Sequence, residues 1–149
     1  MSARTGVGIR EIYTASAKKA EAEMLRELAQ QKPVMLGGDM GFLPWFDFPE
    51  DYHFGGHAFV ACGYDGGQTV LASDMDPQMA GVKKGFYAPV TLEQLAKARG
   101  SVFKPFPPKN LRLEFDFSGF RAPGRREIMA SIAQTESSPK SSVESHSSG

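Results

Sequence analysis

The clearest hydrophobic pattern is helical and lies near the N-terminus. Over residues 16–31, apolar side chains recur every three or four positions, Ser16 can cap the first turn, and Pro33 stops the pattern. This periodicity predicts a helix whose buried face carries Ala17, Ala20, Met24, Leu25 and Leu28.

Apolar runs that are too short for helices predict strands. Residues 33–36 form one such run. Residues 57–64 and 67–74 form two more, on either side of the dipeptide Asp65-Gly66. Asp-Gly between alternating apolar runs is a strong hairpin signal, because a two-residue type I′ turn needs a positive φ at both central positions. We therefore expect an antiparallel hairpin with a two-residue loop.

The second half of the chain carries one more clear helix and one more strand. Thr91 and Gln94 form a capping box, which predicts a helix over residues 91–99. Residues 110–117 alternate with period two and predict a strand whose one face carries Leu111, Leu113, Phe115 and Phe117.

Loops and a weak last helix complete the pattern. Residues 37–56 are rich in Gly, Pro and aromatic rings, and so long a loop inside a compact domain usually has a function. Residues 76–89 are also expected to form a loop, and residues 126–133 a weak helix. The order helix, strands, helix, strand predicts an α+β protein with an antiparallel sheet and flanking helices.

The hairpin leads to a prediction about chemistry. With a two-residue loop, Tyr64 faces Gly67, and His57 faces Asp74 at a non-hydrogen-bonded position with both side chains on one face of the sheet. The carboxylate can then accept a hydrogen bond from one ring nitrogen and leave the other nitrogen free to act as a base. Such a pair is the His–Asp half of a nucleophile–His–Asp triad.

The lone cysteine does not complete this triad. Cys62 follows His57 by five positions on the same strand, so it is expected about 17 Å away and on the opposite face. Its neighbours on that face, Ala58, Val60 and Leu71, predict a buried packing residue with an inert thiol.

Composition narrows the class of protein. The 149 residues include 17 Lys and Arg against 17 Asp and Glu, and a chain without net charge offers no footprint for nucleic acid or an acidic membrane surface. A single cysteine excludes an internal disulfide and favours a reducing compartment. No apolar window is long enough to span a bilayer. We expect a cytoplasmic protein whose Ser-rich residues 135–149 form a disordered tail.

Simpler explanations stand beside the chemical one. His57 and Asp74 could form an ordinary surface pair worth about 1 kcal/mol or less. His53 and His57 could hold a metal ion together with Asp74, although the Phe-Gly-Gly between them disfavours the helix that this spacing needs, and we expect no metal or cofactor. The aromatic residues of the 37–56 loop could line a substrate groove or pack that loop onto the core.

Three stretches of the chain resemble a known family. They are KPVMLGGDMGFLPW, HFGGHAFVACGYDGGQTVLASD and VTLEQLAKARGS, and the most specific part is GGHAFVACGYD followed by LASD. They resemble the N-terminal domain of butirosin biosynthesis protein H, with the companion domain of unknown function that follows it. The resemblance covers about residues 17–117. It implies a papain-like or peptidase C39-like α+β fold adapted to acyl transfer.

The resemblance implies roles for individual residues. His57 matches the family's general-base histidine, and Asp74 matches the acidic residue that orients it. Asp39 begins a D-x-x-x-L-P segment and has an unassigned role in shaping the site. The candidates for a substrate groove are Asp39, Trp45, Phe46 and Tyr52. In this family an aminoacyl group passes from an acyl carrier protein, through a cysteine thioester, to an amine of an aminoglycoside, so the implied partners are an acyl carrier protein and a small amine acceptor.

One part of the family pattern has no counterpart in this sequence. The family's nucleophile is a cysteine in a Gly-Cys context on a helix near the start of the domain. We therefore expect residues 1–75 to be the C-terminal half of that domain, residues 76–134 to begin the companion domain, and the whole to be a truncated acyltransferase, inactive alone. The alternatives are a non-catalytic binding module that keeps the aromatic groove, and a metal-dependent hydrolase. The oligomeric state stays open.

Overall fold

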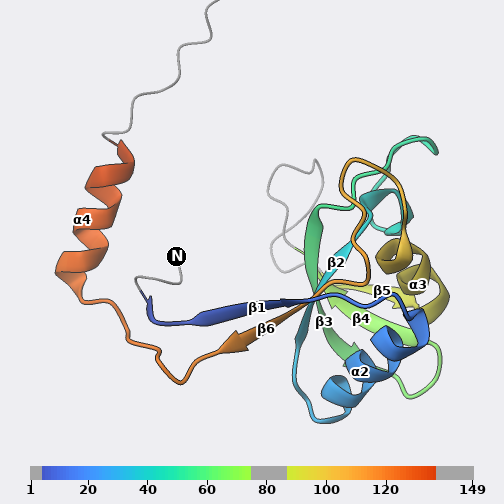
Figure 1. Ribbon diagram of the computed structural model, residues 1–149, viewed down its shortest axis with the longest axis horizontal. Helices are drawn as coiled ribbons and strands as arrows, with labels where there is room; N and C mark the ends of the chain where they lie inside the picture. The colour runs from blue at the N-terminus through green and yellow to red at the C-terminus, as the bar shows by residue number, and fades with distance from the viewer. Residues whose placement is uncertain (1–4, 75–86, 137–149) are drawn as a thin grey trace, which may run out of the picture. The chain divides into compact units, whose positions relative to one another are not determined.

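A computed structural model describes residues 5–74 and 87–136 of the chain (Figure 1). In chain order, the elements are β1 (Gly8–Ile12), α2 (Ala17–Ala29), β2 (Val34–Gly38), the 3₁₀ turn η1 (Met40–Phe42), β3 (His57–Tyr64), β4 (Thr69–Ser73), β5 (Tyr87–Thr91), α3 (Leu92–Gly100), β6 (Arg112–Asp116) and α4 (Arg125–Glu136). Within the described ranges, no helix is long and apolar enough to cross a bilayer.

The chain divides into two compact units. The larger spans Ile9–Phe115, and the smaller combines Met1–Gly8 with Asp116–Gly149. In the smaller unit, the Arg121 backbone N–H donates to Thr5 O at 2.8 Å, and the Arg121 guanidinium binds Glu127 in the first turn of α4.

The strands form one sheet, in the spatial order β1-β6-β2-β3-β4-β5. The pairs β2–β3, β2–β6, β3–β4 and β4–β5 are antiparallel. This confirms the α+β class with an antiparallel sheet and helices. The expected helix caps are also present: Ser16 Oγ accepts from the Lys19 backbone N–H of α2, and Thr91 with Gln94 closes a capping box on α3.

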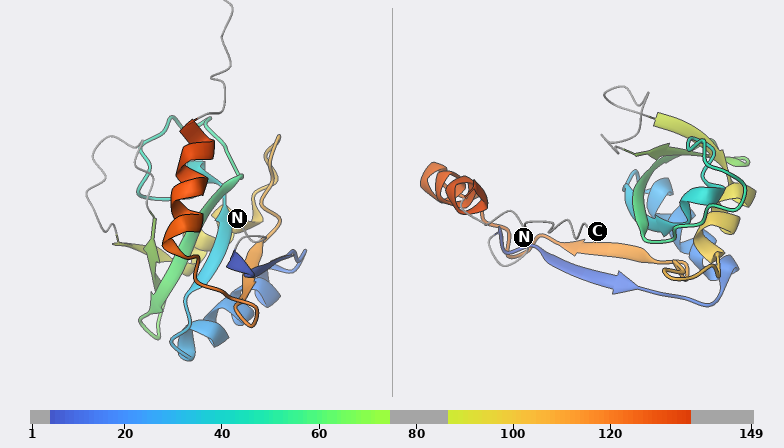
Figure 2. Two further views of the ribbon diagram at one scale, coloured as in Figure 1. Left: turned by 90° about the vertical axis from the view of Figure 1, so that its left-hand side faces the viewer. Right: turned by 90° about the horizontal axis from the view of Figure 1, so that it is seen from above.

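The core lies between one face of strands β2 to β5 and the helices α2 and α3, as the views in Figures 1 and 2 show. Residues paired across neighbouring strands share this face, as Leu36 does with Phe59 and Val70 with Val90. Because His57 precedes Phe59 by two positions, its side chain belongs to the same face. The helices add Met24, Leu28, Leu95 and Ala98 to the core.

The hairpin register differs from the predicted one. Tyr64 pairs with Val70, not with Gly67, and Ala61 pairs with Ala72, with a bulge at Cys62 between them. The cause is the turn, because only Gly66 has a positive φ and a type I′ turn needs two such residues. Instead, the Asp65 carboxylate accepts from the backbone N–H groups of Gly67 and Thr69, which lengthens the loop.

One other prediction from the pattern was wrong. Tyr87, Ala88 and Pro89 belong to strand β5 and not to a loop, since β4 pairs with β5 along its whole length. The strand expected over residues 110–117 is present as β6, and Phe115 and Phe117 at its outer end are exposed. The remainder of the expected 76–89 loop and residues 137–149 of the expected tail lie outside the described residues, and α4 ends at Glu136.

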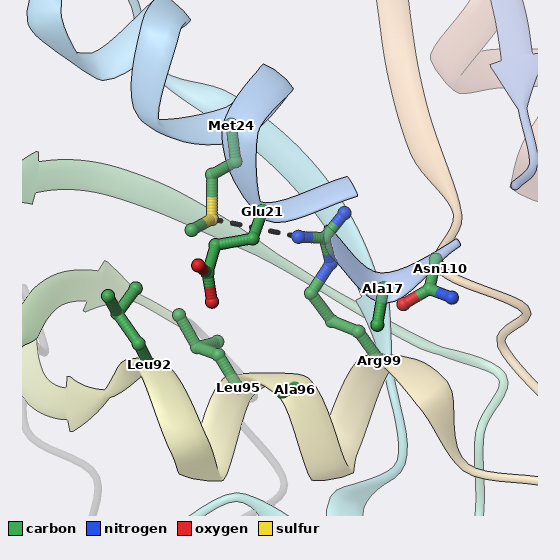
Figure 3. A pocket seen from close by; sticks show the side chains of 8 residues that line it. All are labelled: Ala17, Glu21, Met24, Leu92, Leu95, Ala96, Arg99 and Asn110. Atoms are coloured by element: carbon green, nitrogen blue, oxygen red, sulfur yellow. Dashed lines mark hydrogen bonds between the residues drawn. The ribbon is translucent and has the colours of Figure 1, made fainter. Parts of the chain in front are cut away.

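One charged side chain is buried among the helices. Arg99 of α3 is 3% exposed and reaches toward α2, where its Nη1 donates to Ala20 O at 3.2 Å and touches Met24 Sδ at 3.8 Å (Figure 3). Within the described part of the chain, its Nε has no hydrogen-bond partner and no carboxylate pairs with it. Burial and the nearby Arg112 charge lower the Arg99 pKa to about 10, so it stays charged at neutral pH.

Candidate functional site

His57 and Asp74 meet where the β3–β4 hairpin ends. His57 Nε2 lies 2.7 Å from Asp74 Oδ2, and the two side chains are only 14% and 6% exposed. A carboxylate can only accept, so Nε2 carries the proton in this contact. Among the residues that the structure describes, nothing hydrogen-bonds to His57 Nδ1. In this tautomer of the imidazole, Nδ1 is the nitrogen that can act as a base.

The contact does not arise from the predicted cross-strand pairing. Extending the observed register beyond Ser73 places Asp74 opposite Phe59, so His57 and Asp74 are diagonal neighbours. Diagonal residues on one face of a sheet are still within reach of long or aromatic side chains. The side chains therefore meet even though the register is shifted by two positions.

The carboxylate of Asp74 has a second donor. Trp45 Nε1 donates to the same oxygen, Oδ2, at 2.8 Å, and the indole packs edge-on against Phe59 at a centroid distance of 5.6 Å. Phe46 stands at 88° to the His57 imidazole, with the centroids 5.2 Å apart. Trp45 thus holds the Asp74 carboxylate in place, and Phe46 holds the plane of the His57 imidazole. Such surrounding contacts are a common way to orient a histidine side chain.

A row of rings continues from His57 to the surface. Phe46 stacks on Phe48 at 5.4 Å, and Phe48 contacts Tyr52 at 4.1 Å. Tyr52 is 38% exposed, whereas Trp45 and Phe46 are half-buried and pack against the core. The inner rings of the 39–56 loop therefore pack this loop onto the core, which is one of the two expectations, and the outer ring of Tyr52 faces solvent.

A second His–carboxylate pair lies at the base of the same loop. Asp39 is fully buried, and its Oδ2 accepts from Ser101 Oγ at 2.5 Å and lies 3.0 Å from His53 Nδ1. Its Oδ1 accepts from the backbone N–H groups of Gly41 and Phe54, each at 3.0 Å. With four hydrogen bonds, this carboxylate is saturated. Its side chain is not exposed to solvent.

His53 is enclosed by aromatic rings. The Phe103 ring stacks on its imidazole with centroids 3.5 Å apart and planes 2° from parallel, and Phe42 lies 5.0 Å away. His53 and His57 thus belong to different carboxylates. Within the described residues, no three histidine, cysteine or acidic side chains are grouped to hold a metal ion, so His53, His57 and Asp74 do not form the metal site considered above.

Cys62 lies on the opposite face of β3 from His57, as predicted, but it is half-buried and not fully buried. The bulge frees it from a cross-strand partner, and its Sγ donates to Leu71 O at 3.3 Å. Burial raises the pKa of the thiol, which disfavours the thiolate. Cys62 is therefore not placed to act with His57.

A surface groove of the larger unit lies apart from the His57–Asp74 pair. It has a volume of about 470 Å³ and lies between the segment after β1 and the segment after α3, with Tyr13, Val102 and Lys109 among its lining residues. Ser101 also lines it, so the hydroxyl that binds Asp39 comes from the wall of this groove.

Sequence reasoning missed three contacts of this region. His53 was considered only as a metal ligand, Ser101 was not considered, and Trp45 was expected to line a groove and not to bind Asp74. The one signal in the sequence is Asp39 itself, an acidic residue directly after a buried strand, which must find donors if it is buried. The donors could not be deduced, because Ser101 lies 62 positions away along the chain.

The fold and these contacts define a class: an α+β protein that holds a partly buried histidine, oriented by an aspartate, at the end of a hairpin on its antiparallel sheet. Residues 1–75 match the family described as butirosin biosynthesis protein H, N-terminal, which is half of the 149-residue chain. The protein belongs to this family, and both His57 and Asp74 lie within the matched residues. No curated protein is similar enough to count as a match.

Proposed function

We propose that this chain contributes the general-base pair of an acyl-transfer centre. The observation that supports this best is the 2.7 Å contact of His57 Nε2 with Asp74 Oδ2, which leaves Nδ1 available. Membership in the butirosin H family supports the class of reaction, transfer of an aminoacyl group from a thioester to an amine in antibiotic biosynthesis. The donor and acceptor proposed on this basis are an acyl carrier protein and an aminoglycoside amine.

The chemical step follows from the position of the imidazole. A nucleophile, amine or thiol, gives its proton to His57 Nδ1 while its lone pair attacks the thioester carbonyl. When the tetrahedral intermediate collapses, the C–S bond breaks, and the proton returns from His57 to the leaving sulfur. Asp74 stabilises the imidazolium that exists between these two transfers, and Trp45 keeps the Asp74 carboxylate in place.

A papain-like relationship is part of the same proposal. In its support, the histidine stands at the start of a strand, and the acidic residue directly follows the next strand of an antiparallel sheet. The thiol nucleophile that such a fold uses is not Cys62, whose place on the other face and raised pKa keep it away from His57.

The test is direct aminolysis of a small aminoacyl thioester by an aminoglycoside, followed by mass spectrometry of the amide. In this reaction the amine is itself the nucleophile, so the step that needs His57 can be measured without the family's cysteine. We expect His57→Ala to slow this reaction by about 10²–10⁴-fold, the usual contribution of a positioned general base. Cys62→Ser is the matched control and should leave the rate unchanged. Equal rates in the wild type and His57→Ala would overturn the proposal.

A second candidate is a binding module without chemistry. The observation that favours it is the row of rings from Phe46 through Phe48 to Tyr52, which could hold an apolar acyl chain. In that case the thioester binds without turnover, and Tyr52→Ala weakens binding while His57→Ala has no effect.

A further inference from the structure

Among the described residues of the larger unit, the Asp39 carboxylate is a fully buried acid that the proposed reaction does not use. Each of its four hydrogen bonds comes from a different residue. Gly41 lies near the start of the 39–56 loop, His53 and Phe54 lie near its end, and Ser101 follows α3. A single carboxylate therefore ties both ends of this loop to each other and to the helix layer.

The base of the loop is closed tightly. The Met40 backbone N–H donates to Phe54 O at 3.0 Å, next to the two backbone N–H groups that bind Asp39. A Cβ on Gly41 would overlap the backbone oxygen of Tyr52 and approach His53 Nδ1 to 3.0 Å. The two ends of the loop are thus in direct contact, and the position of everything between them depends on this closure.

The middle of the loop carries the groups that hold the His57–Asp74 pair. Trp45 donates to Asp74 Oδ2 at 2.8 Å, and Phe46 packs edge-on against His57. The loop is therefore fixed at two places, by the saturated Asp39 carboxylate at its base and by Trp45 on Asp74. Losing the first attachment leaves the second on a long flexible segment, whose ordering costs conformational entropy.

We propose that Asp39 is a positioning residue for the His57–Asp74 pair, acting through the 39–56 loop and Trp45. It touches neither reacting group, and it determines how fully the Trp45–Asp74 hydrogen bond and the Phe46–His57 contact are populated. The relevance of this coupling to catalysis rests on the proposed function, whereas the coupling itself is a property of the folded chain.

The sequence supplies a clean probe, because Trp45 is the only tryptophan among the 149 residues. In ¹⁵N-labelled protein, the single indole N–H resonance reports the hydrogen bond to Asp74, and Asp74→Ala gives its position when that bond is absent. We expect Asp39→Asn to move the resonance most of the way to this reference. Asp47→Asn, which removes the same charge from an exposed position of the same loop, is the matched control and should not move it.

Ser101→Ala is the second variant and keeps the proposal testable if Asp39→Asn does not fold. It removes one donor to Asp39 and is expected to shift the indole resonance in the same direction by less, while Ser101→Thr, which keeps the hydroxyl, restores it. Circular dichroism confirms that each variant is folded. An unmoved indole resonance in folded Asp39→Asn, or in Ser101→Ala when Asp39→Asn is unfolded, would overturn the proposal.

The outcome is separable from that of the proposed function. If the indole resonance shifts in Asp39→Asn but the wild type shows no acyl transfer, the positioning role is supported and the proposed reaction is refuted. Acyl transfer that depends on His57, together with an unmoved resonance, removes the positioning role and keeps the reaction.

Discussion

The two His–carboxylate pairs of this protein look alike in sequence and differ in how they are built. His53 and His57 are four positions apart, and each imidazole has a buried aspartate as partner. Asp39, the partner of His53, also binds two backbone N–H groups and a hydroxyl. Among the described residues, the donors to Asp74, the partner of His57, are the imidazole and the Trp45 indole. A carboxylate that accepts from backbone N–H groups holds the path of the main chain, whereas one that accepts from side chains orients those side chains.

We expect the largest difference between the two pairs in the free energy of unfolding, when each carboxylate is removed. Asp39→Ala leaves four donors without their acceptor in a buried place, and we expect it to lower the free energy of unfolding by about 3–5 kcal/mol. Asp74→Ala leaves two side-chain donors that can turn toward water, and should lower it by about 1–2 kcal/mol. Urea unfolding of both variants measures the difference. Equal losses would show that the two pairs are not distinct in kind.

A second way to disturb the Asp39 pair is to crowd the base of the loop. Gly41→Ala places a methyl group against the backbone of Tyr52, and we expect a loss of about 1–3 kcal/mol in the free energy of unfolding. Gly100→Ala, at the end of α3, has open space around the added methyl group and serves as control, with a gain of up to about 1 kcal/mol. Thermal unfolding compares the two, and a neutral Gly41→Ala would contradict the close contact.

Arg99 offers a contrast with the two His–carboxylate pairs, because it is a buried charge that forms no ion pair with a carboxylate in the described part of the chain. Burying a charge costs desolvation free energy that a close ion pair would offset, so we expect Arg99→Met to raise the free energy of unfolding by about 1–2 kcal/mol at pH 7.

The effect of Arg99→Met should depend on pH. The native state releases the Arg99 proton near the lowered pKa of about 10, while the unfolded chain still binds it. The wild type therefore regains stability as the pH rises through about 10, and its deficit relative to Arg99→Met shrinks. A deficit that grows instead, in unfolding experiments at pH 7 and pH 10.5, would mean that the arginine is stabilising.

Local signals in the sequence predicted the elements well, and for a physical reason. The caps at Ser16 and Thr91 and the apolar runs act over a few residues, so the sequence around them is sufficient. The hairpin was predicted, but its register was not, because the Asp65 side chain competes with the two-residue turn by binding Gly67 and Thr69. The two hydrogen bonds of one side chain accompany a shift of the whole ladder.

At the candidate site, too, local sequence signals predicted part of the structure and long-range contacts decided the rest. His57 and Asp74 were named from a register that proved wrong, and their side chains meet because diagonal neighbours also share a face. The saturation of Asp39 by Ser101 and His53 was outside the reach of any pattern, since its donors come from three separate segments.

The sequence by itself determined the helices, most of the strands, the α+β class and the two residues of the candidate pair, because each depends on periodicity or on neighbours along the chain. Only the tertiary structure decided what each aspartate does. A buried carboxylate must collect donors from whatever packs around it, and packing brings together Gly41, Phe54 and Ser101 around Asp39 but Trp45 and His57 around Asp74. That choice of donors, made in three dimensions, separates the structural pair from the candidate catalytic one.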